Sequence, residues 1–218
     1  QSIQDALIAA DRLFQIMDLE QEKVNSHTIS NLDFEKVALR FRKVCCKYPA
    51  QPFSLTNIDL EITPGSVVAV VGESGSGKST LLSKKKKKNT AVSGNIFLNH
   101  LDITHISRQT LSDTIATVPQ SLTVFSGTII QNIALDDHEP DIARIISIAH
   151  YLGMDSFIEK LPDGLYTRIS EDGLNISGGE KQKIAIARAL YTDPKILLFD
   201  EASSSLDSCS EAYIKKLG

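Results

Sequence analysis

A glycine-rich stretch from Gly72 to Thr80, reading Gly-Glu-Ser-Gly-Ser-Gly-Lys-Ser-Thr, carries the residue types that bind a phosphate chain. Glycines at these spacings let backbone N–H groups approach an anion closely, and a helix that starts here adds positive potential. Lys78 is placed to reach the β- and γ-phosphates of a nucleotide, and the Ser79 hydroxyl is placed to bind Mg²⁺. A glycine turn that merely caps a helix explains neither side chain. The stretch therefore predicts a P-loop that binds a nucleoside triphosphate.

The residues on either side supply the context that a P-loop requires. Residues 66–71, Ser-Val-Val-Ala-Val-Val, are an apolar run with many β-branched side chains, which predicts a buried central strand. The stretch Thr80-Leu81-Leu82 predicts the first turn of a helix. Strand, glycine-rich loop and helix in this order strengthen the prediction of a phosphate-binding site.

Two acidic residues follow another apolar run. Ile196–Phe199 predicts a buried parallel strand, and Asp200 and Glu201 come directly after it. Acidic residues at the carboxyl edge of an open sheet face the ligand crevice. We expect Asp200 to hold Mg²⁺ and Glu201 to polarise an attacking water. The alternative is that both acids are solvent-facing caps of the strand.

A Ser-Gly-Gly turn at residues 177–179 precedes an amphipathic helix that spans residues 183–190. Such a turn at a helix N-terminus is a second anion-binding site. One nucleotide has only one terminal phosphate, so two such sites in one chain need an explanation. The turn therefore predicts two subunits, each of which offers its helix end to the nucleotide of the other.

Composition excludes several other classes of protein. The net charge of −4, without a basic stripe interleaved with aromatics, argues against a nucleic-acid binder. No apolar run approaches the roughly 20 residues that span a bilayer. Three cysteines without C-x-x-C spacing predict neither a disulfide framework nor a zinc site. The five histidines form no metal-binding pattern, and we interpret each as structural.

Hydrophobic patterns divide the rest of the chain into regions of strand and of helix. Alternation predicts strands at residues 39–44, 53–62, 93–100 and 115–120. Helical spacing is present at residues 128–134, 141–151 and 156–160, and strand character returns only at residue 195. The economical architecture is an α/β core with a mostly helical insertion.

Five motifs, in order along the chain, resemble those of an ABC-transporter ATPase domain, and the match runs from about Leu39 to Asp207. Sequence segments such as Phe125–Ile129 resemble those of the exporters of that family, and residues 175–182 are similar to the corresponding segment of exporters of bacteriocin-like peptides. The motifs are the Walker A (Gly72–Thr80), the Q-loop (Gln120), the signature (Ile176–Glu180), the Walker B (Ile196–Glu201) and the D-loop (Ser205–Asp207).

The resemblance implies an α/β fold: a RecA-like P-loop NTPase core with an antiparallel β subdomain and an inserted α-helical subdomain. Residues 1–33 correspond to the end of the last transmembrane helix and a linker, and residues 34–218 to the ATPase domain. Its core takes residues 34–121 and 193–218, and the helical insertion takes about 122–192.

Two departures from the family pattern affect these expectations. The family's switch histidine lies further beyond the D-loop than this sequence extends, which predicts a C-terminally truncated domain with weak ATPase activity. The lysine run Lys84–Lys88 stands where the family has mainly apolar residues on a helix under the sheet. Burying unpaired ammonium groups is costly, so we interpret this run as engineered or erroneous.

The resemblance also implies a role for each site residue. Glu201, Lys78 and Gln120 are expected to act in hydrolysis, and Ser79, Gln120 and Asp200 to bind Mg²⁺. Tyr48 is expected to stack on the adenine of ATP. The P-loop residues expected to bind its phosphates are Gly72, Glu73, Ser74, Gly75, Ser76, Gly77, Lys78, Ser79 and Thr80. The residues expected to bind the ATP held by the other subunit of the dimer are Ser177, Gly178, Gly179, Glu180 and Asp207.

The function implied is the ATP-binding and hydrolysing motor of an exporter, with ATP and Mg²⁺, at the cytoplasmic face of the inner membrane. Its expected partners are a second ATPase domain and the coupling helices of a transmembrane domain, contacted through the Q-loop and a loop around Glu171. Two alternatives remain: a soluble ABC-type nucleotide-dependent clamp outside transport, and a regulatory ATP-binding subunit with little hydrolysis.

Overall fold

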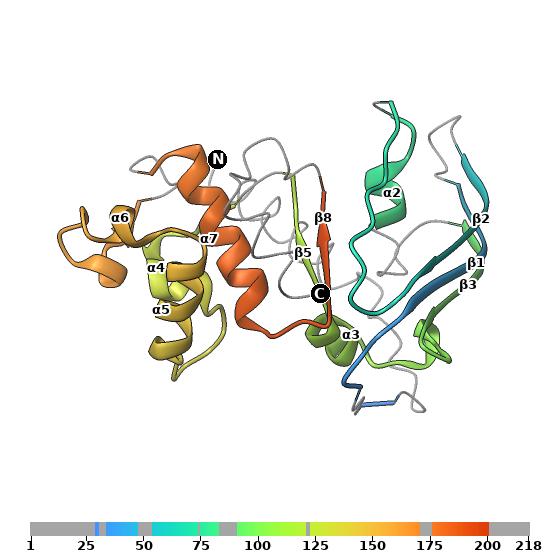
Figure 1. Cartoon of the computed structure of the whole chain (residues 1–218), viewed down its shortest axis with the longest axis horizontal. Coiled ribbons are helices and arrows are strands. Elements are labelled where there is room, and N and C mark those ends of the chain that lie inside the picture. Colours follow the sequence, from blue (N-terminus) through green and yellow to red (C-terminus); the bar gives the residue numbers. More distant parts are fainter. Residues whose placement is uncertain are drawn as a thin grey trace, which may run out of the picture.

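The elements of the chain fall into three groups, shown in Figure 1: an antiparallel sheet, a short parallel sheet and a helical region. The computed structural model describes residues 29–30, 34–47, 54–73, 75–82, 91–120, 123–170 and 176–200. In Figure 1, β5 (Ile115–Val118) and β8 (Ile196–Phe199) stand at the centre, with the helical region on one side and α2 (Lys78–Leu82) and the antiparallel sheet on the other.

The antiparallel sheet has the strand order β2-β1-β3-β4. Its strands are β1 (Leu39–Lys47), β2 (Ser54–Ile62), β3 (Ala91–Leu98) and β4 (Leu101–Asp102). The pairing of β1 with β3 shifts register between Arg42 and Cys45, where Lys43 has a left-handed φ of 49°. Gly94 lies against this bulge, and a Cβ there would come within 2.3 Å of the Lys43 carbonyl oxygen. Only a glycine therefore fits opposite the bulge.

The parallel sheet joins two segments that lie far apart in the sequence. Strands β5 and β8 pair in parallel from Ile115↔Ile196 to Val118↔Phe199. Helix α3 (Arg108–Thr114) leads directly into β5, and the side chain of Ser107 caps its first turn by accepting a hydrogen bond from the Thr110 amide. A short 3-10 turn, η2 (Ile103–His105), connects β4 to this helix.

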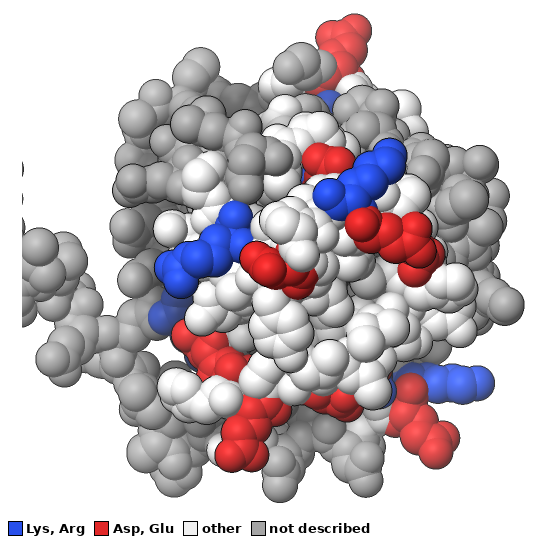
Figure 2. Space-filling view, turned by 90° about the vertical axis from the view of Figure 1, so that its left-hand side faces the viewer, with Lys and Arg blue, Asp and Glu red and all other residues white. Residues whose placement is uncertain are grey.

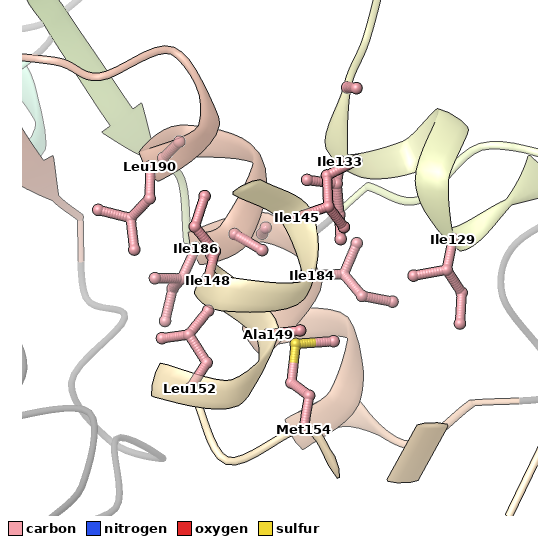
Figure 3. Packing of buried hydrophobic residues seen from close by; sticks show 14 of the residues in the cluster. Ile129, Ile133, Ile145, Ile148, Ala149, Leu152, Met154, Ile184, Ile186 and Leu190 are labelled. Carbon is pink, nitrogen blue, oxygen red and sulfur yellow. The ribbon is translucent and has the colours of Figure 1, made fainter. Parts of the chain in front are cut away.

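The helical region lies between β5 and β8 in the sequence. It comprises β6 (Gly127–Thr128), α4 (Ile129–Ile133), α5 (Ile142–Tyr151), α6 (Asp155–Ile158), η3 (Gly164–Tyr166), β7 (Arg168–Ile169) and α7 (Gly178–Tyr191). Figure 3 shows isoleucines of α7 packed against α4 and α5. Apolar side chains recur at helical spacing, so each helix buries one face in this core. The residues labelled there are Ile129, Ile133, Ile145, Ile148, Ala149, Leu152, Met154, Ile184, Ile186 and Leu190.

These elements confirm the predicted α/β fold, with its antiparallel sheet and its helical segments between β5 and β8. The predicted strand at residues 66–71 is wrong: this segment belongs to no strand, and Val67 and Val71 are 67% and 91% exposed. A central strand needs hydrogen-bonding neighbours, and none of the described strands pairs with it. Strand β8 is half-buried rather than buried, because β5 is its one described neighbour.

The surface of the helical region carries charges of both signs. Figure 2 shows lysines and arginines as well as aspartates and glutamates among the described residues of this face. Within the described ranges, no helix has the length and hydropathy needed to cross a bilayer.

Candidate nucleotide-binding site

The P-loop forms a tight turn whose conformation depends on glycine. Gly75 and Gly77 have φ values of 82° and 95°, in the left-handed region that favours glycine. A Cβ on Gly72 would come within 2.8 Å of the Ser76 hydroxyl oxygen, so the loop closes tightly on itself. The amide of Ser76 donates to the Glu73 carbonyl at 3.2 Å. The backbone is thus bent in the way that phosphate-binding loops require.

The Lys78 side chain folds back over this loop. Its ammonium group donates to the carbonyl oxygens of Gly72 and Glu73, at 2.9 Å each. An ammonium group has three N–H donors, so a third donor is left for a phosphate oxygen. The positive charge of Lys78 is therefore held beside the glycine-rich loop.

Ser79 and Asp200 meet although they lie 121 residues apart in the sequence. The Ser79 hydroxyl donates to Oδ1 of Asp200 at 2.7 Å. The end of β8 fixes Asp200, because its amide donates to the Val118 carbonyl of β5 at 3.1 Å. A hydroxyl and a carboxylate are the hard oxygen ligands that Mg²⁺ prefers, and a nucleotide and water usually supply the rest of its shell. The pair therefore fits a magnesium site.

Gln120 lies at the same edge of the parallel sheet as this pair. It follows β5 by two residues, and Val118 is the residue whose carbonyl binds the amide of Asp200. The Gln120 side chain is exposed at this edge. The structure thus brings together the P-loop, Asp200 and the strand end that carries Gln120. Four further predicted site residues lie outside the described residues: Tyr48, Ser74, Glu201 and Asp207.

The Ser177 turn begins α7 with a capping box. The Ser177 hydroxyl accepts from the Glu180 amide at 3.3 Å, and the Glu180 carboxylate accepts from the Ser177 amide at 2.7 Å. A Cβ on Gly178 or Gly179 would meet no described atom within 4 Å, so the turn has an open face. Glu180 thus caps its own helix, a role that the motif alone did not reveal.

The helix that begins at the Ser177 turn, α7, and the helix that follows the P-loop, α2, are separated in space. Figure 1 shows β5 and β8 between α7 and α2. The structure therefore does not bring the turn to the phosphate site of the same chain.

Sequence reasoning missed two polar residues that hold the segment after Gln120. Asn132 is 1% exposed in the apolar helix α4, and Arg188 of α7 reaches it from the other side of the core. A buried asparagine within an apolar helical stretch was the available signal, because such a side chain needs partners for all its polar atoms.

Comparison with known proteins identifies the family. The family model described as ABC transporter matches residues 55–204, which include the P-loop, Gln120, the Ser177 turn and Asp200. The chain belongs to the ABC transporter family. The glycine-rich loop and the Ser79–Asp200 pair are therefore part of an ABC-type ATP-binding domain, and the predicted resemblance to exporters is confirmed by its relatives.

Several curated proteins are similar over nearly the whole chain. They include the ABC multidrug transporter mdr2 of Aspergillus fumigatus (39% identical over 94% of this chain and 26% of that protein) and an ATP-dependent lipid A-core flippase of Legionella pneumophila (38% over 98% of this chain and 36% of the flippase). A putative export ATP-binding/permease protein of Rickettsia bellii is 40% identical over 94% of this chain. The chain thus spans about a third of the length of these relatives, or less.

A solved structure has the same fold. The ATP-bound structure of a bacterial Atm1-family ABC exporter matches with a TM-score of 0.82 and 33% sequence identity. The match covers 99% of this chain and 38% of the exporter chain. The arrangement of sheets and helical region described above is therefore that of an exporter ATP-binding domain.

Proposed function

We propose that this chain is the ATP-binding and hydrolysing motor domain of an ABC exporter. The observation that carries the proposal is the Ser79–Asp200 hydrogen bond of 2.7 Å beside the Lys78 ammonium group. A hydroxyl and a carboxylate from distant segments meet beside a loop whose backbone is shaped for phosphates. The relatives, which are named as transporters, flippases and exporters, support the same reading.

Each residue at this site has a task in the proposed reaction. The P-loop amides and Lys78 bind the phosphates, and Tyr48 stacks on adenine. Ser79, Gln120 and Asp200 hold Mg²⁺, which neutralises charge on the β- and γ-phosphates when bound. Glu201, the residue after Asp200, accepts a proton from the attacking water and so directs it at the γ-phosphate.

The second anion site completes the proposal as a head-to-tail dimer. Ser177, Gly178, Gly179 and Glu180 of one chain, with Asp207, are proposed to close over the nucleotide bound to the other chain. The separation of α7 from α2 in Figure 1 supports a contact in trans, because the open face of the turn does not reach the P-loop of its own chain. A serine hydroxyl that accepts a capping bond still has a hydrogen to donate to a phosphate.

The whole protein is proposed to be a membrane exporter in which this domain lies at the cytoplasmic face. In this scheme, residues 1–33 lead from a transmembrane helix, residues 34–218 form the ATPase domain, and residues 122–192 form its helical insertion. The Q-loop and the Glu171 loop contact the transmembrane domain. The proposed cargo is a bacteriocin-like peptide, and this part of the proposal rests only on the sequence similarity of residues 175–182 to exporters of such peptides.

Binding of a fluorescent ATP analogue with Mg²⁺ tests the nucleotide site. Lys78→Ala should abolish binding, because the phosphates lose their charged partner. Lys160→Ala, an exposed lysine that follows α6, is the matched control and should bind as the unaltered chain does. Equal affinity in all three proteins would overturn the proposal.

Size-exclusion chromatography with saturating ATP tests the dimer. Glu201→Gln should accumulate an ATP-bound dimer, because the nucleotide that joins the two chains is no longer hydrolysed. The matched control is Glu159→Gln, which neutralises a carboxylate that follows α6 and should leave the elution unchanged. A Glu201→Gln protein that binds ATP and stays monomeric would contradict the head-to-tail arrangement.

A further inference from the structure

Arg188 connects α7 to the segment that follows Gln120. Its Nε donates to the Asn132 carbonyl at 2.7 Å, one terminal nitrogen donates to the Thr123 carbonyl at 3.0 Å, and the other to Oδ1 of Asn132 at 3.3 Å. The guanidinium carbon also lies 5.3 Å from the centroid of the Phe125 ring. One side chain thus holds three points of the 123–132 segment.

Asn132 completes the connection from within α4. Its amide nitrogen donates to the carbonyls of Phe125 and Thr128 at 2.8 and 3.0 Å, and its Oδ1 accepts from the Phe125 amide at 2.8 Å. The side chain is 1% exposed and has partners for both its donor and its acceptor. Asn132 therefore folds the 125–128 turn onto α4, and Arg188 ties this unit to α7.

The partners of Arg188 make this contact geometric rather than ionic. Within the described part of the chain they are carbonyl oxygens, an amide oxygen and a ring, and none is a carboxylate. Burial lowers the pKa of Arg188, but a guanidinium group stays protonated in proteins. The planar fork fixes directions that a flexible lysine ammonium would not.

Both ends of this connection are joined along the chain to proposed site residues. Two residues lie between Gln120 and Thr123 in the sequence, so the Cα atoms of Gln120 and Thr123 are at most about 11 Å apart. Arg188 follows Ser177 by eleven residues along the single helix α7, about 16 Å of helix rise. The loop that carries Gln120 is therefore connected to the Ser177 turn through the hydrogen bonds of Arg188 and the helix α7.

We propose that Arg188 and Asn132 are positioning residues, which couple the loop bearing Gln120 to the helix bearing the Ser177 turn. The inference deepens the proposed function and rests on it. Arg188 contacts neither nucleotide nor Mg²⁺ in this scheme. It transmits the change at Gln120, when MgATP binds, to the 123–134 segment and to α7.

Hydrogen–deuterium exchange of the whole chain, with and without the fluorescent ATP analogue and Mg²⁺, tests this coupling. Arg188→Met keeps an apolar stem of similar length and removes the fork. The matched control is Arg144→Met, because Arg144 also donates to an α7 carbonyl, that of Leu190 at 3.3 Å, but no bond is described between it and the 123–134 segment. Arg188→Lys retains the charge without the fork.

The coupling predicts three results. Exchange of the amides of 123–134 rises about tenfold in Arg188→Met without nucleotide, because several hydrogen bonds to a charged group are lost. The nucleotide-dependent protection of that segment, present in the unaltered chain, disappears in Arg188→Met and is partly restored in Arg188→Lys. The analogue's Kd changes by less than about twofold, since the P-loop is intact.

A purely structural role would raise exchange equally in the free and bound states and keep the nucleotide-dependent difference, and that result would overturn the proposal. If circular dichroism shows that Arg188→Met is unfolded, Arg188→Lys and Phe125→Ala, which replaces an exposed ring, are compared instead. Unchanged amide exchange of residues 123–134 in both variants would also overturn the proposal. An unaltered chain that binds no analogue would contradict the proposed function rather than the positioning role of Arg188. The exchange of 123–134 without nucleotide would then still test whether Arg188 holds the segment.

Discussion

In the helical region, Ile129 and Ile133 of α4, Ile145 of α5 and Ile184 and Ile186 of α7 are almost completely buried, and two capping boxes fix the starts of α4 and α7. At the nucleotide-binding end, by contrast, the valines of residues 66–71 are exposed. The core beside that end also contains a small apolar pocket, lined by Val70 and Leu198 among others. Packing against several neighbours stabilises the helical region, while the P-loop segment lacks a described strand on either side.

This difference shows where each region obtains its order. In the helical region, amphipathic helices bury their apolar faces against one another in a shared core. The described part of the phosphate loop instead has short-range hydrogen bonds within residues 72–81 and a long-range hydrogen bond from Ser79 to Asp200. Substitutions in the two regions should therefore affect different observables.

The largest expected effect is on stability in the helical region. Ile184→Ala removes a side chain that is 0% exposed in the core of α7, so it should destabilise the chain by about 2–5 kcal/mol. Val71→Ala, at a 91% exposed site, should change stability by less than about 0.5 kcal/mol. Urea denaturation measures both. Comparable losses for the two variants would mean that the 66–71 segment packs as tightly as α7.

The next effect is on nucleotide affinity alone. Tyr48→Ala should weaken binding of MgATP by about 1–3 kcal/mol, the range for an aromatic ring stacked on a base. Tyr166→Ala removes an exposed tyrosine of the helical region and should leave affinity unchanged. Titration of the fluorescent analogue into both variants measures this. An unchanged affinity of Tyr48→Ala would remove adenine stacking from the proposed site.

A third pair of variants separates helix capping from nucleotide contact. Thr128 and Ser177 each occupy the N-cap of a capping box, on α4 and α7, so replacing either with alanine should cost about 0.5–2 kcal/mol of stability. Thermal denaturation measures this loss. Ser177→Ala alone should also reduce ATP-dependent dimerisation in the Glu201→Gln background. Equal dimerisation of the two alanine variants would leave Ser177 with its capping role only.

The smallest effect concerns acid stability of the antiparallel sheet. Burial would raise the pKa of Asp102, but hydrogen bonds from the Thr104 amide and the Asn95 side chain outweigh burial and lower it. The folded state therefore favours the ionised carboxylate. Its contribution to stability is present above the unfolded pKa of about 4 and is lost as pH falls through the lowered folded pKa.

Denaturation from pH 6 to pH 2.5 checks this contribution. Asp102→Asn should be less stable than the unaltered chain at pH 6 and should lose less stability on acidification. Asp113→Asn, an exposed carboxylate on α3, is the comparison variant and should follow the unaltered chain. Parallel pH profiles for Asp102→Asn and the unaltered chain would refute the assignment.

The sequence alone determined the local parts of this protein. The spacing of glycines with Lys78 and Ser79 predicted the phosphate loop. Hydrophobic periodicity predicted β1 and β5 within three residues at each end, and it predicted α7 with a start five residues too late. The ordered motifs predicted the family that the comparisons then showed. These features depend on neighbouring residues, so a pattern in the sequence is enough to reveal them.

Only the tertiary structure decided which distant residues meet and which faces are covered. The Ser79–Asp200 contact spans 121 residues, and the bonds from Arg188 to Asn132 and Thr123 join α7 to a segment more than fifty residues earlier. The 66–71 run has the composition of a buried strand, yet its valines are exposed. Strand burial depends on hydrogen-bonding neighbours supplied from elsewhere in the chain, and composition does not specify whether they are present.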